Sequence, residues 1–201
     1  MLDHRVNTLL QRPLQSMARW LLGCGLRANH ITWIGFVLGL TAVPLIAFGH
    51  SSWAILSIVL NRLADGLDGS MARLTAPTDR GAFLDICLDF LFYSSIPLAF
   101  VLADPVHNGL AGALLIYSFI GTGCTFLAFA VLAAQRGKSS VTFPSKGFYY
   151  LGGLTESTET IAVFIAMCLF PAWFTVLAVL FAALCLLTTV LRIRAGMEAF
   201  E

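Results

Sequence analysis

The sequence predicts an all-α integral membrane protein: six transmembrane helices preceded by an amphipathic interfacial helix, with both termini in the cytoplasm. The 201 residues are 58% hydrophobic and only 11% charged, whereas soluble domains carry about 25% charged residues. Most of the apolar stretches have the length, about 20 residues, that a helix needs to cross a bilayer. All twelve basic residues except Arg62 fall in the two terminal segments or in every second loop between the expected spans. These segments would all lie on one side of the membrane, as the positive-inside rule expects. The net charge of +1 gives no indication of a nucleic-acid partner.

The N-terminal segment, residues 1–28, is expected to contain the amphipathic helix over residues 3–22. Apolar residues from Val6 to Leu21 form one stripe, and Arg5, Arg12 and Arg19 recur every seven residues on another face. Such a helix lies in the membrane interface with its arginines toward the lipid phosphates. The alternative is that it packs on cytosolic loops of its own chain.

A six-helix transmembrane domain is expected over residues 29–194, with a short cytoplasmic tail at 195–201. Asn29 is expected to cap the first helix. The first four spans are expected near residues 31–48, 53–73, 81–103 and 109–134. The fifth begins near Phe148 and is short of continuous apolar residues, and the sixth ends near Arg192. We count the fifth as a span because without it the C-terminal arginines would lie on the opposite side from the other basic residues.

Four aspartates lie in two pairs where the second and third expected spans meet. Asp65 and Asp68 are three residues apart, and Asp85 and Asp89 are four apart. On helices, each pair projects from one face. Both pairs lie a few residues inside the cytoplasmic ends of their helices, so we expect the four carboxylates to meet at one depth.

Burying these carboxylates has a cost that needs compensation. An Asp at mid-span costs about 2.5–3.5 kcal/mol on insertion scales, so four would cost roughly 10 kcal/mol. Protonation, pairing with Arg62, Arg73 or Arg80, or divalent cations could compensate. Hard oxygen ligands on two adjacent helices suit Mg²⁺, Mn²⁺ or Ca²⁺. A cation site is therefore favoured, with a structural ion-pair network as the alternative.

Small residues lie one helical turn from the acids. Gly69, Ala72 and Gly81 leave room beside the carboxylates, although membrane helices also use small residues for close packing. With Arg73 adjoining, a pocket open to the cytosol and floored by metal would suit a phosphate-bearing substrate. Two metals beside a phosphate typically serve displacement at phosphorus.

The pattern of these residues resembles the signature of the CDP-alcohol phosphatidyltransferases at all eight defining positions. The matching residues are Asp65, Asp68, Gly69, Ala72, Arg73, Gly81, Asp85 and Asp89. The expected six-span layout and the opening of the first span at Asn29–Thr32 agree with it. The resemblance implies transfer of a phosphatidyl group from CDP-diacylglycerol, or another CDP-alcohol, to the hydroxyl of a small alcohol, with release of CMP.

The resemblance also implies roles for individual residues. Asp65, Asp68 and Asp85 would bind two divalent cations, Mg²⁺ or Mn²⁺, and Asp89 would be a further metal ligand, the catalytic base, or both. The residues that would hold the cytidine diphosphate are Asp65, Asp68, Gly69, Ala72, Arg73, Thr78 and Gly81. The resemblance also suggests a homodimer. The basic residues place the site on the cytoplasmic side, which is that of the cell (inner) membrane if the protein is bacterial. Gly121 and Gly123 would allow close packing in that dimer.

The acceptor must be inferred from the start of the fifth expected span. Family members that use phosphorylated acceptors tend to carry basic residues there, whereas this chain has Glu156 and Glu159, which would repel a phosphate. An unphosphorylated polyol or amino-alcohol is therefore favoured. Glycerol phosphate or inositol phosphate is the alternative, served by Arg136, Lys138 and Lys146. The glutamates could instead pair with Arg62 or make interhelical hydrogen bonds.

Two other classes of membrane protein compete with an enzyme. Intramembrane acids also mark the pathways of cation transporters. A transporter predicts acids spread through the membrane depth and inverted repeats, whereas these acids share one level and no repeat is evident. A non-catalytic metal-binding protein does not need Ala72, Arg73 and Gly81 at fixed offsets.

Overall fold

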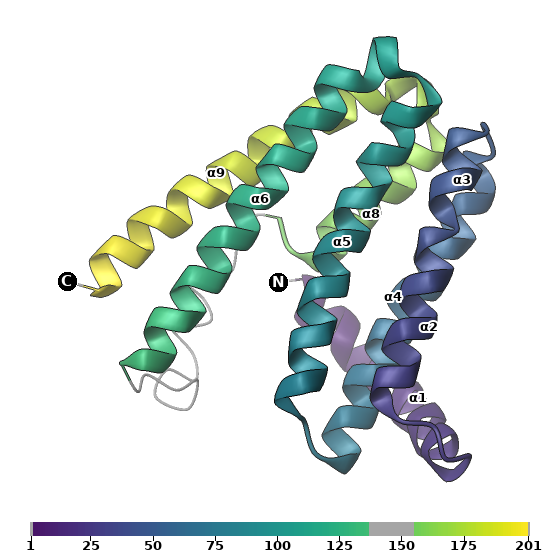
Figure 1. The fold of residues 1–201 in the computed structure, drawn as a ribbon, viewed down its shortest axis with the longest axis vertical. Helices are drawn as coiled ribbons and strands as arrows, with labels where there is room; N and C mark the ends of the chain where they lie inside the picture. Colours follow the sequence, from purple (N-terminus) through teal and green to yellow (C-terminus); the bar gives the residue numbers. More distant parts are fainter. Residues whose placement is uncertain (1, 137–154, 201) are drawn as a thin grey trace.

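The computed structural model describes residues 2–136 and 155–200, and these residues form helices joined by short turns (Figure 1). No strand occurs in these two ranges. The helices are α1 (Leu2–Gly23), α2 (Ala28–Leu40), α3 (Ala42–Ala47), α4 (Ser51–Thr75), α5 (Asp79–Ala103), α6 (Pro105–Gln135), α8 (Ser157–Leu169), the 3₁₀ turn η1 (Pro171–Trp173) and α9 (Phe174–Phe200).

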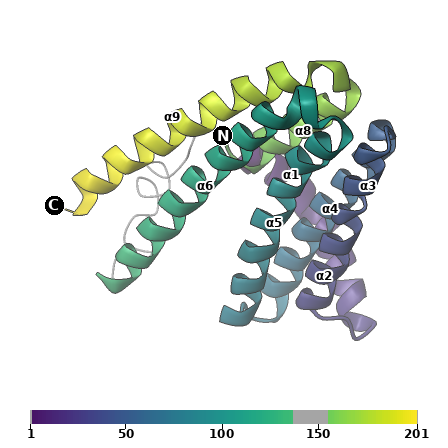
Figure 2. The same ribbon diagram turned by 45° about the horizontal axis from the view of Figure 1, so that its top comes forward.

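Figures 1 and 2 show how these helices are grouped. α2, α3, α4 and α5 pack side by side, and α1 lies against α4. α6 and α9 run parallel to each other, and α6 also packs against α5. The two groups meet near the α5–α6 turn and diverge toward the other end of the molecule (Figure 2). α8 packs mainly against α4, which places its first turn behind the helices that carry the aspartates.

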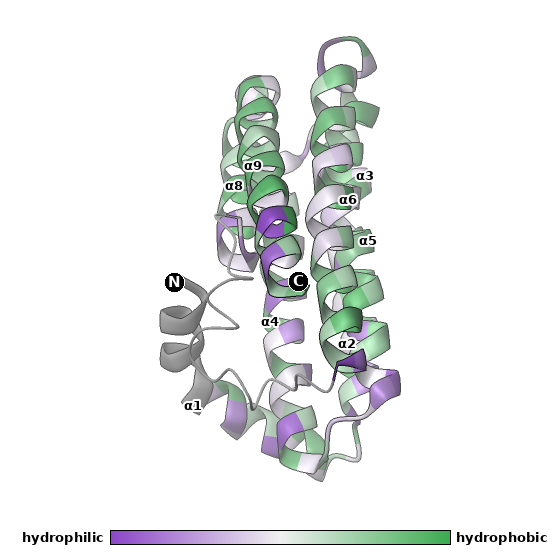
Figure 3. Cartoon of the chain, turned by 90° about the vertical axis from the view of Figure 1, so that its left-hand side faces the viewer, coloured by the Kyte–Doolittle hydropathy of each residue, from purple (hydrophilic) through white to green (hydrophobic). Residues whose placement is uncertain are grey.

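Four helical stretches are long and apolar enough to cross a membrane. They are Ala28–Ala47, Asp79–Ala103, Pro105–Gln135 and Pro171–Phe200. α4 has 25 residues but carries four charged ones, and α8 has only 13 residues. Figure 3 shows apolar residues along most of the helix surfaces, with most of the hydrophilic ones in the lower half of the view and some in the turn at the top. A count of six spans, the interfacial placement of α1 and the orientation of the termini remain predictions.

Two boundaries differ from the sequence prediction at the first span. The span is divided at Thr41 because Pro44, which has no amide proton, cannot donate the helical hydrogen bond to Leu40. At this break the Thr41 hydroxyl donates to the Leu38 carbonyl oxygen at 2.6 Å and lies 2.7 Å from the Ser57 hydroxyl of α4. Asn29 is not the helix cap: α2 begins at Ala28, and Arg27 occupies the N-cap position.

The last helix is longer than the sequence predicted. α9 continues through Phe200, into the segment expected as a tail. Two contacts extend it: Arg194 pairs with Glu198 at 3.3 Å, and Arg136 donates to the Phe200 carbonyl at 2.8 Å. For the fifth expected span, the described helix begins at Ser157, and residues 148–154 lie outside the described ranges.

The expected N-terminal helix is present as α1, and part of its predicted stripe is buried. Leu14 and Ala18 are buried, and a Cβ on Gly66 of α4 would lie 3.1 Å from Leu14. Met17, also assigned to the stripe, is 45% exposed. α1 therefore contacts the helix that carries Asp65 and Asp68.

Glycines set the close approach of the helices. A Cβ on Gly35 of α2 would collide with Ala64 of α4, and one on Gly39 would lie 2.9 Å from Asn61 and Phe92. α2 is thereby held against the acidic part of α4. Gly121 and Gly123 pack within the chain, against Thr189 of α9 and Phe90 of α5, so the expected use of these two glycines in a dimer contact is wrong.

Candidate active site

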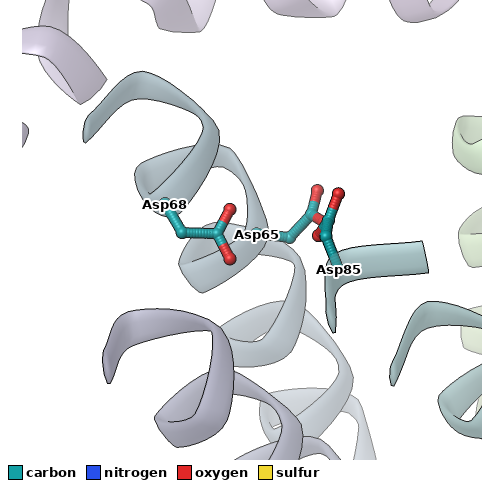
Figure 4. A group of neighbouring side chains, drawn as sticks. All are labelled: Asp65, Asp68 and Asp85. Atoms are coloured by element: carbon teal, nitrogen blue, oxygen red, sulfur yellow. The ribbon is translucent and has the colours of Figure 1, made fainter. Parts of the chain in front are cut away.

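Three of the four aspartates meet between α4 and α5. Asp65 and Asp68 project from α4 toward Asp85 on α5 (Figure 4). One carboxylate oxygen from each lies within 4.8 Å of the others. A short turn after Thr75 reverses the chain, and Thr78 caps α5 by accepting a hydrogen bond from the Gly81 amide at 3.1 Å. The expected meeting of the two helices is confirmed for these three acids.

The donor set fits a divalent cation. Asp68 is only 6% exposed, and its Oδ2 has no hydrogen-bond partner. Among the described buried side chains, Asn61 Oδ1 is the other oxygen without one. Both residues line a cavity of about 20 Å³, room for a water molecule or an ion, together with Asp65, Asp85 and Asp89. Buried oxygens without a donor are costly, and oxygen ligands are the kind that Mg²⁺ and Mn²⁺ prefer.

Asp89 lies beside this group but is paired differently. Its Oδ1 lies 3.6 Å from Nη1 of Arg62, and the other terminal nitrogen of Arg62 pairs with Asp65. Within the described ranges, no ion pair reaches Asp68 or Asp85. Arginine pairing, one of the compensations weighed from the sequence, is therefore present at Asp65 and Asp89. The oxygens of Asp65, Asp68 and Asp85 are grouped closely enough that they could also hold a cation.

Arg62 is itself held by residues from two other helices. Its Nη1 donates to the Tyr93 hydroxyl at 2.7 Å, and that hydroxyl lies 2.8 Å from the Ser157 hydroxyl at the start of α8. The Arg62 side chain is 24% exposed. A continuous polar chain thus runs from the acids on α4 and α5 to α8.

A second, larger cavity adjoins the acids at the end of α4 and the starts of α2 and α5. Its volume is about 750 Å³, within the usual range for ligand pockets. It shares Thr32, Asp68 and Asp85 with the small cavity. Of the residues expected to hold the cytidine diphosphate, only Asp65 is absent from its lining, and Asp65 lines the small cavity. The others line the large cavity: Asp68, Gly69, Ala72, Arg73, Thr78 and Gly81.

The small residues of the motif are close to polar groups in this cavity. A Cβ on Gly69 would lie 3.4 Å from Nη1 of Arg73, and one on Gly81 would lie 3.1 Å from Asn29 Oδ1 and Thr78 Oγ1. Arg73 also donates to the Ser70 hydroxyl at 3.1 Å. Glycine at both positions keeps these two points of the cavity wall free of side-chain carbon. Arg27 and Arg80 add positive charge to the lining.

The residues expected at the acceptor side lie elsewhere or are partly engaged. Glu156 is the N-cap of α8, and the Glu159 carboxylate accepts a hydrogen bond from the Glu156 amide at 3.2 Å. Arg136 ends α6, where it bonds the Phe200 carbonyl and lies over the Phe200 ring at 5.1 Å. Lys138 and Lys146 lie outside the described residues.

Sequence reasoning missed several polar residues of the site. Asn61 is four residues before Asp65, and Tyr93 is four after Asp89. Extending each acid's helical face by one turn would have found both. Ser157 carries no such local signal, because its contact with Tyr93 depends on how α8 packs.

Fold and site together define a helical membrane protein with an acidic cluster that could hold a divalent cation, beside a basic cavity of a size to hold a phosphate-bearing ligand. The family model for CDP-alcohol phosphatidyltransferase matches residues 26–191. The chain belongs to this family, as its motif suggested, and it is an integral membrane protein of phospholipid biosynthesis.

Known proteins agree with this assignment. The chain is 48% identical over 196 residues to the inner membrane protein YnjF of Escherichia coli, covering 98% of this chain and 95% of that one. It is 27% identical over 117 residues to the archaetidylinositol phosphate synthase of Pyrococcus horikoshii, covering 58% of this chain and 62% of that one. In fold it matches the crystal structure of the Mycobacterium tuberculosis phosphatidylinositol phosphate synthase with CDP-DAG bound. The TM-score is 0.69 at 22% identity, over 92% of this chain and 94% of that one.

Proposed function

We propose that the protein transfers a phosphatidyl group from CDP-diacylglycerol, or another CDP-alcohol, to the hydroxyl of a small alcohol and releases CMP. The observation that carries this proposal is the junction of the two cavities. The three clustered acids border the small one, and the motif residues other than Asp65 and Asp89 line the large one. A transporter or non-catalytic protein has no need for a basic nucleotide-sized cavity at that junction.

The large cavity would hold the cytidine diphosphate. Arg73, at the end of α4, lies on its wall and would pair with the diphosphate, since guanidinium groups bind phosphate oxygens well. Gly69, Ala72 and Gly81 would let the nucleotide approach the backbone. Thr78 already accepts the Gly81 amide proton, so its contribution to nucleotide binding would be indirect. The acyl chains of the donor would lie between helices in the bilayer.

Asp65, Asp68 and Asp85 would hold the two divalent cations, Mg²⁺ or Mn²⁺. Bound there, they would draw charge from the diphosphate and stabilise CMP as it leaves. Asp89 would take the proton of the acceptor hydroxyl. The hydroxyl oxygen then forms its bond to the β-phosphorus as the bond from that phosphorus to the CMP oxygen breaks.

For the acceptor we propose an unphosphorylated polyol or amino-alcohol. Support comes from the carboxylates of Glu156 and Glu159 at the first turn of α8, joined to the site through Ser157 and Tyr93. A phosphorylated acceptor is the second candidate. It is favoured by two similar proteins, which are synthases of inositol phosphate lipids.

The proposed reaction is to be tested with purified protein, CDP-diacylglycerol and a panel of alcohols, with lipid products identified by mass spectrometry. Serine, glycerol and inositol would form the unphosphorylated arm, and glycerol phosphate and inositol phosphate the other. Product from the first arm supports the full proposal. Product from the second arm alone keeps the reaction and overturns the acceptor. No lipid product in either arm would contradict the function.

For the membrane arrangement we propose six spans, with α4 and α8 as the two that composition alone does not identify. α1 would lie in the interface, and the site would open to the cytoplasm, since Arg27, Arg73 and Arg80 surround the large cavity. The N-terminal segment 1–28, the catalytic domain 29–194 and the short C-terminal segment are proposed as its three parts. A homodimer is proposed from family resemblance.

A further inference from the structure

The Arg62 guanidinium occupies a slot between the two helices that carry the acids. Asp65 lies one turn along its own helix, and Asp89 and Tyr93 lie one turn apart on α5. The Tyr93 hydroxyl is in turn hydrogen-bonded to Ser157 of α8. We propose that Arg62 is a positioning residue for Asp89, and that Tyr93 and Ser157 fix Arg62 in that position. This inference rests on the proposed function.

Arg62 contacts two aspartates and a tyrosine at the same time, and these contacts fix the position of its guanidinium group. A guanidinium offers several N–H donors in a rigid plane. Its two terminal nitrogens are directed at Asp65, Asp89 and the Tyr93 hydroxyl at once. Each contact limits rotation of the group about the others. A side chain held in this way keeps a fixed position, whereas a lysine would provide one point of charge on a flexible stem.

Arg62 pairs with one acid of the cluster, Asp65, and with Asp89, which lies outside the cluster. Asp65, Asp68 and Asp85 have oxygens grouped within 4.8 Å, and Asp89 is not part of that group although it lines the same cavity. Arg62 draws the Asp89 carboxylate to the side. Asp89 is thereby kept available to take a proton from the acceptor, while the three grouped acids face the cation site.

Ser157 completes the arrangement from a third helix, α8, through its bond to Tyr93 of α5. The Tyr93 hydroxyl has Arg62 on one side at 2.7 Å and Ser157 on the other at 2.8 Å, so the phenol cannot swing away without losing both bonds. Since reacting groups misplaced by about 1 Å can cost roughly 100-fold in rate, loss of this link should lower turnover while leaving the donor cavity intact.

The test compares steady-state CMP release by wild type, Tyr93→Phe, Ser157→Ala and the double variant. We expect Tyr93→Phe to lower kcat about 10-fold and Ser157→Ala about 3-fold, with KM for CDP-diacylglycerol unchanged. The double variant should be no slower than Tyr93→Phe, because both substitutions break one link. Arg62→Lys should retain part of the activity that Arg62→Met loses.

Tyr117→Phe and Ser95→Ala are matched controls, since Tyr117 is exposed on α6 and Ser95 bonds only its own helix at Phe92.

Three results would overturn the inference: wild-type kcat in Tyr93→Phe, losses in the double variant that multiply, or a raised KM for the donor as the main effect. A wild type that forms no CMP would instead reject the proposed function. The inference would then be decided by thermal unfolding of Arg62→Met, Asp89→Asn and the double variant in detergent. Midpoint shifts that do not add would support the pairing, and additive shifts would reject it.

Discussion

The hydroxyl of Tyr93 on α5 lies 2.8 Å from that of Ser157 on α8, although the two residues are 64 positions apart. Tyr93 is one turn from Asp89, so this bond joins α8 directly to the helix pair that carries the acids. It connects the region we assign to the acceptor with the region we assign to the cation and the nucleotide.

The division between the grouped acids and Asp89 predicts different effects on metal affinity. Asp68→Asn should weaken Mn²⁺ binding at least about 10-fold, because a buried ligand oxygen is replaced within the cluster. Asp89→Asn should change it less than about 3-fold, since Asp89 faces Arg62. Titration of Mn²⁺ followed by electron paramagnetic resonance measures both without requiring turnover. Equal losses in the two variants would make Asp89 a ligand as well.

Arg73 should contribute to donor binding and not to folding. Arg73→Ala removes a guanidinium from the wall of the large cavity and should raise KM for CDP-diacylglycerol about 10- to 100-fold, the range of a charge-assisted hydrogen bond. Arg194→Ala is the control, because Arg194 lies exposed on α9 and pairs with Glu198. A normal KM in Arg73→Ala would place the diphosphate elsewhere.

Close packing of α2 on α4 should be sensitive to a single methyl group. Gly35→Ala puts its Cβ against Ala64 and should destabilise the protein by about 1–3 kcal/mol, as overpacking does. Gly109→Ala in α6 meets nothing within 4 Å and should be neutral or slightly stabilising, because alanine favours helices over glycine. Thermal unfolding in detergent compares the two. Equal midpoints would show that α2 can shift to accommodate the methyl group.

The capping pair at α8 allows charge to be tested without loss of the cap. Glutamine can replace glutamate in a capping box, so Glu159→Gln should keep the melting temperature of the wild type. If the glutamate repels phosphate, as we propose, the variant should gain turnover with inositol phosphate or glycerol phosphate. Unchanged acceptor preference together with unchanged stability would limit Glu159 to capping.

Local patterns predicted most of the fold and the centre of the site. Apolar length and alternating basic turns located the helices, and the spacing of Asp65, Asp68 and Asp85 placed them together. The break at Thr41 was missed because Pro44 lies inside an otherwise continuous apolar run. The extension of α9 to Phe200 depends partly on Arg136 of the distant helix α6, which local composition does not show. The Arg194–Glu198 pair, four residues apart on α9, is a local signal that could have indicated it.

The parts of the site that escaped prediction depend on packing between distant helices. The pairing of Arg62 with Asp89 requires the register of α4 against α5, and the contribution of Ser157 requires the position of α8. Spacing along one helix contains neither. The same limit explains why Gly121 and Gly123 were assigned to a dimer when they contact Thr189 and Phe90 of their own chain.

The most direct test of the proposed reaction is CMP release from CDP-diacylglycerol by wild type and Asp89→Asn, with an accepted alcohol. Each protein is assayed with Mg²⁺, with Mn²⁺ and with a chelator. We predict release by wild type that requires the metal, and release by Asp89→Asn at least about 100-fold slower with Mn²⁺ bound. Release that continues in the chelator, or at the wild-type rate in Asp89→Asn, would contradict the roles assigned to the acids.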